Sequence, residues 1–438
     1  MRVSTSEAGM DPRALTDAAR AELEAFTRRL PSITAELFLS AGRRLSLEYE
    51  VGTGSSTISQ GESLSVAARV WEGERSGHAV LPLGGSEGLG RVLELAVRRM
   101  GTGSPPPPVV GELAGPASPP LAGLSSERMR EQAARLTRMV VPPGVVVQAM
   151  VLARSETWTA LLRGEGGFQE AAHEREEAFV RCETSRGAVV DAVASRRGDD
   201  WDLASLRARL AGDVEALEGP AGAVEPALPL VLRPAVAAPL VAALGWMLRG
   251  DVAASLPALA RAVGKKPFPS VLCVEDVPLH PLGTRWRSAD DEGTPTRPLR
   301  LIDEGRLQGF LHSAASAARL GVESNGRGLR FEDAPPAPSA VNLFVVPRGD
   351  ALPEHYTELV ARVETFTTMP RPGTVTLLAG GWEVRAGQRV RRVAPVDLSL
   401  PVLETFRALR GVGSDLTFFP TAEGCGTPTL FFPPLLGG

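Results

Sequence analysis

The chain has 438 residues, with 43% hydrophobic and 22% charged side chains and a formal net charge of −4 at pH 7. This length suits two or three globular domains. The slightly acidic balance, with no long basic block, argues against nucleic acid as a partner, because phosphate contacts need a clustered basic face.

The expected compartment follows from the ends, the apolar runs and the cysteines. The first residues, MRVSTSEAGMDPRAL, lack the apolar centre of a secretory signal. The most apolar stretch, residues 229–251, has an uncharged part that is shorter than the about 20 residues of a membrane span. Three widely spaced cysteines indicate reduced thiols. We therefore expect a cytoplasmic protein that does not bind a membrane.

The first hundred residues predict one unit of helices and strands. Asp11 and Pro12 suit the cap and first position of a helix, and apolar residues then recur at helical spacing until Pro31. Alternating segments over residues 32–83 predict strands joined by tight turns. A second helix is expected over residues 87–100.

The next hundred residues complete an expected N-terminal domain. Residues 101–126 contain four consecutive prolines and predict a loop with extended polyproline geometry. A helix over residues 127–139, two strand-like segments and a helix over residues 203–217 follow. We expect residues 1–220 to form an α/β domain with a mixed sheet.

The second half of the chain is expected to be rich in strands. PLVLRPAVAAPLVAALGWMLRGD at residues 229–251 predicts a buried helix, because it is apolar nearly all round. Later segments predict a hairpin around Asp303-Glu304-Gly305, a helix over residues 355–364, a second hairpin around Ala386-Gly387-Gln388 and two final strands. Residues 221–438 should form a β-rich, barrel-like domain that contains the buried helix, and the whole fold should be α+β.

Two segments of this half resemble one known family. They are LVL…PLVAALGWMLRGD and VLCVEDVPLHPLGTRWRSADDEGTPTRPLRLIDEGRLQGFLHSAASAARLG, and a terminal segment, VGSDLTFFPTAEGCGTPTLFFPPL, follows in the same order as in that family. The family is TldD/PmbA, bacterial proteins once called modulators of DNA gyrase, which comprise zinc-dependent peptidases and their partner subunits. The resemblance implies that the buried helix lies along the floor of a cleft that is catalytic in relatives.

The residues that carry the chemistry in those relatives are missing here. Active members present an HExxxH motif on this helix, and the matching positions are Val241, Ala242 and Trp246. A catalytic zinc needs lone-pair donors from His, Cys or carboxylate, and these three side chains have none. The position of the third ligand, a Cys in relatives, falls near residues 413–415 and holds no Cys. We predict no catalytic residue, metal ligand or cofactor in this chain, and leave open whether the chain has any enzymatic activity.

A polar loop and one asparagine are the candidates for substrate contact. In relatives the segment matching residues 290–296 lies near the groove, and its polar, Gly- and Pro-bearing sequence suits either a structural turn or a binding loop. Asn342 is open to the same two interpretations. The candidate groove residues are Arg285, Asp291, Glu292, Thr296 and Asn342.

Three functions follow from this pattern. The chain looks closer to the PmbA (TldE) type, which implies a non-metal-binding subunit of a heterodimeric zinc protease that acts on unfolded peptides, with zinc in a TldD-type partner. The second is a stand-alone pseudo-protease, possible as a homodimer, that binds peptide without cutting it. The third is a metallopeptidase with relocated ligands, for example His280, His312 or Cys425.

Overall fold

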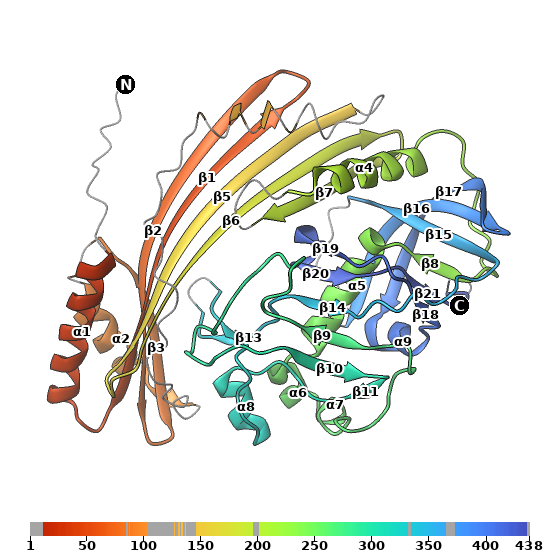
Figure 1. Ribbon diagram of the computed structural model, residues 1–438. Helices are drawn as coiled ribbons and strands as arrows, with labels where there is room; N and C mark the ends of the chain where they lie inside the picture. The colour runs from red at the N-terminus through yellow and green to blue at the C-terminus, as the bar shows by residue number, and fades with distance from the viewer. Residues whose placement is uncertain are drawn as a thin grey trace.

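The computed structural model describes residues 12–435, apart from residues 85, 87, 104–126, most of 128–145, 196–200, 332–333 and 365–372. It has three layers of sheet and the helices between and around them (Figure 1). The expected α+β class is confirmed. The expected proline-rich loop lies outside the described residues, as does most of the helix expected over residues 127–139.

The N-terminal part is a seven-stranded sheet in the order β4-β3-β2-β1-β5-β6-β7. Its long middle strands curve over the rest of the molecule (Figure 1). Every ladder in it is antiparallel, so the expectation of a mixed sheet was wrong for this part. The strands are β1 (Thr34–Glu50), β2 (Ser55–Glu72), β3 (Arg75–Pro82), β4 (Gly101–Thr102), β5 (Val146–Arg163), β6 (Phe168–Thr184) and β7 (Gly187–Ser195).

Helices α1 (Pro12–Arg29) and α2 (Gly88–Arg98) cover one face of this sheet, as their apolar stripes predicted. They pack on inward residues of the strands such as Leu37, Leu39 and Val70, which alternate with residues on the opposite face. Helix α4 (Leu203–Leu217) packs at the other end of the sheet and also against the C-terminal strands. The predicted domain boundary near residue 220 falls directly after α4 and stays a prediction.

The C-terminal part contains two six-stranded sheets with helix α5 (Pro234–Met247) between them. Both sheets are mixed, because β14 pairs in parallel with β20 and β15 pairs in parallel with β8. The first sheet contains β11 (Arg306–Leu307), β10 (Leu299–Asp303), β9 (Val274–Asp276), β14 (Leu343–Val345), β20 (Cys425–Thr427) and β19 (Thr417–Phe419).

The second sheet contains β17 (Gln388–Pro401), β16 (Thr374–Arg385), β15 (His355–Val363), β8 (Leu230–Leu232), β21 (Leu430–Phe432) and β18 (Gly411–Val412). The small elements are α6 (Gly250–Ser255), α7 (Pro257–Ala260), α8 (Ala314–Leu320), α9 (Val402–Arg407), the 3-10 turn η1 (Pro420–Ala422) and the pair β12 (Gly328–Leu329) and β13 (Ala337–Pro338). None of the sheets closes into a barrel among the described residues.

Both expected hairpins are present. Glu304 and Ala386 have positive φ angles of 44° and 48°, and each precedes a glycine with positive φ, which is the backbone of a tight two-residue turn. The helix expected over residues 355–364 was wrong, because this segment is β15 in the middle of a sheet. None of the described helices is long and apolar enough to span a bilayer.

Candidate functional site

Helix α5 is buried between the two C-terminal sheets, as its apolar sequence predicted. Pro234 stands at its start, where a missing N–H costs nothing. Val236, Leu240 and Leu244 are fully buried in the largest apolar cluster, between the two C-terminal sheets. The helix is therefore part of the core, and apolar packing holds it in place between the two sheets.

The three motif positions offer no ligand for a metal. Val241 is fully buried, Ala242 is half-buried, and Trp246 is 44% exposed. Alkyl groups have no donor atom, and the indole nitrogen carries a hydrogen in place of a lone pair. A zinc ion as held in the family does not fit these residues, and no chemical step is assigned to it in this chain.

The glycines around these positions are retained for steric reasons. A Cβ on Gly245 would lie 2.7 Å from Leu343 Cδ2 of the neighbouring sheet. A Cβ on Gly250 would lie 2.3 Å from His312 Nδ1 and 3.0 Å from the Leu311 carbonyl oxygen. The backbone N–H of Gly250 donates to that same carbonyl over 2.8 Å. The close packing at Gly245 and Gly250 therefore leaves no room for a side chain at either position.

The three relocated-ligand candidates lie in separate environments. His312 is buried at the start of α8, where its Nδ1 lies 3.2 Å from Ser316 Oγ and burial lowers its pKa to about 4. His280 is sandwiched between Phe344 and Phe418, with ring centroids 4.9 Å from each. Burial raises the pKa of the Cys425 thiol to about 12. Within the described ranges, no three or more His, Cys, Asp or Glu residues form a group that could hold a metal ion.

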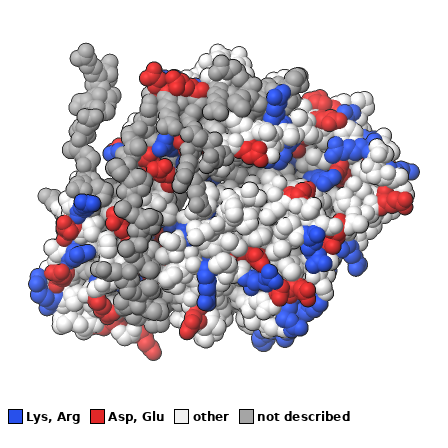
Figure 2. All heavy atoms as spheres, viewed as in Figure 1, with Lys and Arg blue, Asp and Glu red and all other residues white. Residues whose placement is uncertain are grey.

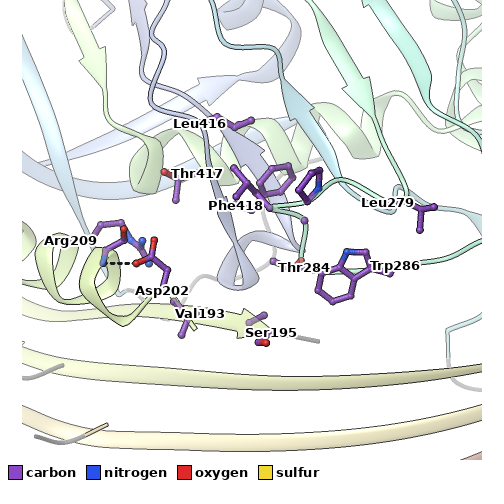
Figure 3. Close-up of a pocket in the computed structure, with 15 residues that line it drawn as sticks. Val193, Ser195, Asp202, Arg209, Leu279, Thr284, Trp286, Leu416, Thr417 and Phe418 are labelled. Carbon is purple, nitrogen blue, oxygen red and sulfur yellow. Dashed lines mark hydrogen bonds between the residues drawn. The ribbon is translucent and has the colours of Figure 1, made fainter. Parts of the chain in front are cut away.

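A cavity of about 700 Å³ opens beside this core, between the N-terminal and C-terminal parts (Figure 3). The end of β7 and the first turns of α4 form one wall. Loop 279–286 and strand β19 form the other wall, and β19 and β20 separate the cavity from α5. Leu279 and Leu282 stand at this wall with 61% and 62% exposed side chains, beside Phe418. We name this space the interdomain cavity.

Asn342 lies behind one wall of the interdomain cavity and is hydrogen-bonded to the loop that forms this wall. It is fully buried, and its Nδ2 donates to the carbonyl oxygens of Val277 (3.0 Å), Pro278 (3.2 Å) and Arg285 (2.6 Å), while its Oδ1 accepts from the Arg285 N–H. Gly283 fits against it only without a Cβ, which would lie 2.6 Å from the Asn342 amide. The structural interpretation of Asn342 is thus supported by four hydrogen bonds.

The loop over residues 290–296 forms a charged connection to the N-terminal sheet. Glu292 is fully buried and accepts from Arg69 Nη1 over 2.7 Å and from the Ala314 N–H over 2.7 Å. Glu36 of β1, also fully buried, accepts from Arg69 Nε (2.6 Å) and Arg330 Nη2 (2.9 Å), and contacts Arg163 Nε at 3.3 Å. We name these five residues, Glu36, Arg69, Arg163, Glu292 and Arg330, the charged joint.

Burial and the neighbouring arginines act in opposite directions on the pKa of Glu36 in the charged joint. Burial acts to raise the pKa of Glu36, but the neighbouring arginines, Arg69 first, outweigh it and hold that pKa below its usual value. Burial, followed by the neighbour Arg69, lowers the pKa of Arg330 to about 10. Next to the joint, burial and the nearby Glu292 raise the pKa of Asp290 to about 7.

The remaining candidate residues are held by local bonds. Asp291 accepts from Arg287 Nη1 over 2.6 Å and from the Arg330 N–H over 2.7 Å. Thr296 Oγ1 donates to the Arg287 carbonyl oxygen over 2.5 Å. Arg285 is half-buried, and burial and the nearby Arg175 lower its guanidinium pKa. A direct contact between these candidates and a peptide stays a prediction.

Sequence reasoning missed four of the five members of the charged joint: Arg330 in the C-terminal part, and Glu36, Arg69 and Arg163 on the N-terminal sheet. The last three lie on the sheet face opposite the helices, and a faint signal was present: Phe38 and Trp71 are large apolar residues on that same face, which indicates that both faces are covered. Figure 2 shows acidic and basic side chains interspersed over the described part of one side of the molecule.

Comparison with known proteins places this fold and its emptied helix. Residues 226–435 match the family described as "PmbA/TldA metallopeptidase C-terminal domain". This half of the chain is thus a metallopeptidase-type domain. The match covers just under half of the chain.

Similar proteins agree with this assignment. A Synechocystis protein named as a metalloprotease is 31% identical over 144 residues, and the match spans 31% of this chain and 30% of that protein. The chain therefore covers less than a third of that curated relative. Two solved structures share the fold: a putative modulator of a DNA gyrase from Thermotoga maritima (TM-score 0.78, 17% identity, 95% of this chain and 99% of that one) and TldE from Thermococcus kodakarensis (TM-score 0.77, 20% identity, 95% and 98%).

Proposed function

We propose that this chain is the non-metal-binding subunit of a heterodimeric peptidase, with a metal-bearing TldD-type chain as its partner and unfolded peptides as substrate. One observation carries the proposal: the chain packs closely at Gly245 of α5 and Gly250 of α6, while Val241, Ala242 and Trp246 supply no donor atom. The likeness to a TldE structure supports the same role, since the two chains match over almost their whole lengths.

The role of this chain in such a pair is to shape the space that holds the peptide. The interdomain cavity has exposed apolar side chains at Leu279 and Leu282, and its polar lining includes Thr284, whose Oγ1 has no hydrogen-bond partner among the described residues. An extended peptide needs both apolar contacts and backbone hydrogen bonds. The cavity provides both kinds of group next to the metallopeptidase-type domain.

The experiment is a reconstitution with the TldD-type chain of the same organism. We expect the isolated chain to contain almost no zinc by elemental mass spectrometry and to leave a reduced, unfolded polypeptide intact. Mixed with the partner, it should co-elute in size-exclusion chromatography, and only the mixture should cleave. A partner variant that lacks a metal-binding histidine serves as the control. Stoichiometric zinc or cleavage in the isolated chain would contradict the proposal.

A second candidate is a peptide-binding pseudo-protease that acts without a partner. The interdomain cavity favours it, because it offers within this chain exposed apolar side chains and the hydroxyl of Thr284, which is unpaired among the described residues. It predicts that the isolated chain, as monomer or homodimer, binds a labelled unfolded peptide with the same affinity before and after the partner is added. A gain in affinity on adding the partner would favour the heterodimer instead.

A further inference from the structure

A second cavity, of about 380 Å³, is lined in part by Arg69 and Glu292 of the charged joint. Its walls come from strands β2 and β3, the end of α2, the start of α8 and the segment Pro335–Pro336. It is separate from the interdomain cavity, with which it shares no lining residue. Neither the family resemblance nor the proposed function assigns a role to it.

Strand register places a row of polar side chains along one face of the sheet towards this cavity. Arg163 pairs with Glu36, Glu36 pairs with Arg69, and Arg69 pairs with His78, across four neighbouring antiparallel strands. Residues directly opposite one another in antiparallel strands point to the same face. Arg69 and His78 therefore stand side by side where the row reaches the cavity.

Two buried polar atoms of this pair have no hydrogen-bond partner among the described residues. Arg69 is only 8% exposed, and its Nε and Nη1 are used by Glu36 and Glu292, but its Nη2 has no hydrogen-bond partner among the described residues. His78 Nε2 is also buried and has no hydrogen-bond partner among the described residues. Buried polar atoms are nearly always paired, so two adjacent exceptions in one cavity indicate a ligand or ordered water.

The charges around the cavity favour an anion. Among the described residues that line the cavity, two arginines, Arg69 and Arg99, stand against one carboxylate, Glu292. Arg99 lies at the rim. An oxyanion is the ligand that guanidinium forks and imidazole donors bind best.

The opposite lining is apolar. The Trp71 ring is 5% exposed and carries the Arg69 guanidinium over its face at 5.1 Å, while Ala314, Ala315, Pro335 and Pro336 form the far wall. The volume exceeds that of a bare phosphate or carboxylate group, since a single water occupies about 30 Å³. The cavity thus has room for a small organic body beside the charged group.

We propose that this cavity binds a small oxyanion, a carboxylate or a phosphate with a small organic body, through Arg69 Nη2, His78 and Arg99. Arg69 is fixed in direction by Glu36 and Glu292, so the donor is positioned before the ligand arrives. Arg99, which is exposed, supplies charge at the entrance.

His78 reports on this binding. Burial, followed by the charges of Arg330, Arg69 and Arg99, lowers its pKa to about 4, and Glu36 opposes them weakly. Glu292 also faces the cavity. A bound anion adds negative charge next to the imidazole and raises the His78 pKa. The imidazole of His173, whose pKa also lies at about 4, is outside this cavity and serves as an internal reference.

The test uses histidine-selective nuclear magnetic resonance on the intact chain. Five histidines give five signals. The probes are inorganic phosphate, N-acetylphenylalanine and, as its uncharged twin, N-acetylphenylalanine amide, with sodium chloride at matched ionic strength as the screening control. We expect phosphate, the carboxylate or both to shift the His78 signal in a saturable way, with a dissociation constant of about 0.1–1 mM for a ligand of this size. The amide should have no effect, and whichever anion binds more tightly identifies the class of ligand.

Two neighbouring surface arginines give a matched pair of variants. Arg99→Gln should weaken the anion about fivefold, whereas Arg98→Gln, which alters an exposed residue of the same helix outside the cavity, should leave the affinity unchanged. The proposal is overturned if His78 does not respond, if chloride or the amide shifts it equally, if His173 shifts by the same amount, or if the two variants weaken binding alike. None of these results depends on the peptidase proposal.

Discussion

Helix α5 and the charged joint are two buried regions that connect distant parts of this chain, and they are built in opposite ways. The helix is apolar nearly all round and is packed between two sheets. The charged joint places five charged side chains, with Glu36 and Glu292 fully buried, between the N-terminal sheet and the loop at residues 290–296. The sequence resemblance had directed attention to chemistry on the helix and to substrate contact on the loop.

The difference shows what apolar residues and charged residues each contribute to a buried region. Once α5 has no metal to hold, polar side chains in it would be buried without partners, and apolar ones stabilise the core instead. In the charged joint the ions gain little net stability, but removing one member leaves the others buried and unpaired. We infer that the joint fixes the orientation of the two parts, while α5 supplies the packing energy.

The largest effect is expected from breaking the charged joint. Glu36→Gln keeps the shape of the side chain and removes the charge that faces three arginines, so the free energy of unfolding should fall by about 3 kcal/mol. Urea unfolding followed by circular dichroism measures this. Glu62→Gln, in an exposed pair with Arg43, is the matched control and should change stability by less than about 0.5 kcal/mol. Equal losses of stability in the two variants would mean that the charged joint contributes no more to stability than an exposed ion pair does.

A smaller effect is expected from disturbing the end of α5. Gly250→Ala forces a methyl group to within 2.3 Å of His312 Nδ1, and the free energy of unfolding should fall by about 2 kcal/mol. Gly309→Ala is the control, since a Cβ there has no neighbour within 4 Å. Adding His312→Ala to Gly250→Ala should recover part of the loss. An additive double variant would show that the clash lies elsewhere.

The sequence predicted the apolar α5, because a stretch that is apolar all round can only be buried. It predicted β15 wrongly, because Tyr356, Leu359 and Val363 recur at helical spacing, and only the neighbours β8 and β16 on either side make the segment a strand. Local periodicity cannot show that a segment lies in the middle of a sheet.

The charged joint was beyond sequence reasoning for a different reason. Glu36, Arg69 and Arg330 are far apart along the chain, and each alone resembles an ordinary surface charge. Strand register brings the first two together, and the fold of the C-terminal part supplies the third. In contrast, the three residues predicted to stand at motif positions, Val241, Ala242 and Trp246, lie within one helix, as the sequence predicted.

The pH dependence of stability offers a more moderate test of the joint region. The folded-state pKa of Asp290 is raised to about 7 by burial and Glu292, so the fold favours its protonated form. Its contribution is fully present below the unfolded pKa near 4 and is lost as the pH rises towards 7. The free energy of unfolding of Asp290→Asn, relative to that of the wild type, should therefore rise by about 1 kcal/mol or more between pH 4.5 and pH 8.

Titration of the histidines does not alter the difference in stability between Asp290→Asn and the wild type. His78, His173 and His312 have lowered pKa values, so each stabilises the fold above pH 6.5 and loses that contribution as the pH falls towards 4. Their contributions are common to wild type and variant and cancel in the difference. A difference between Asp290→Asn and wild type that stays constant with pH, measured by urea unfolding at each pH, would refute the assignment of the raised pKa to Asp290.

The smallest effect on stability, and the most specific effect on function, is expected in the interdomain cavity, away from both regions. Leu282 is 62% exposed at the cavity wall, so Leu282→Asp should change the free energy of unfolding by less than about 0.5 kcal/mol. It places a charge where the proposed function requires apolar contact, and should weaken binding of an unfolded, apolar peptide about tenfold in fluorescence anisotropy. Leu256→Asp, at a 44% exposed leucine outside the cavity, is the matched control. If both variants weaken the peptide equally, the peptide does not lie in this cavity, and the retained packing of α5 would have to serve the partner interface alone.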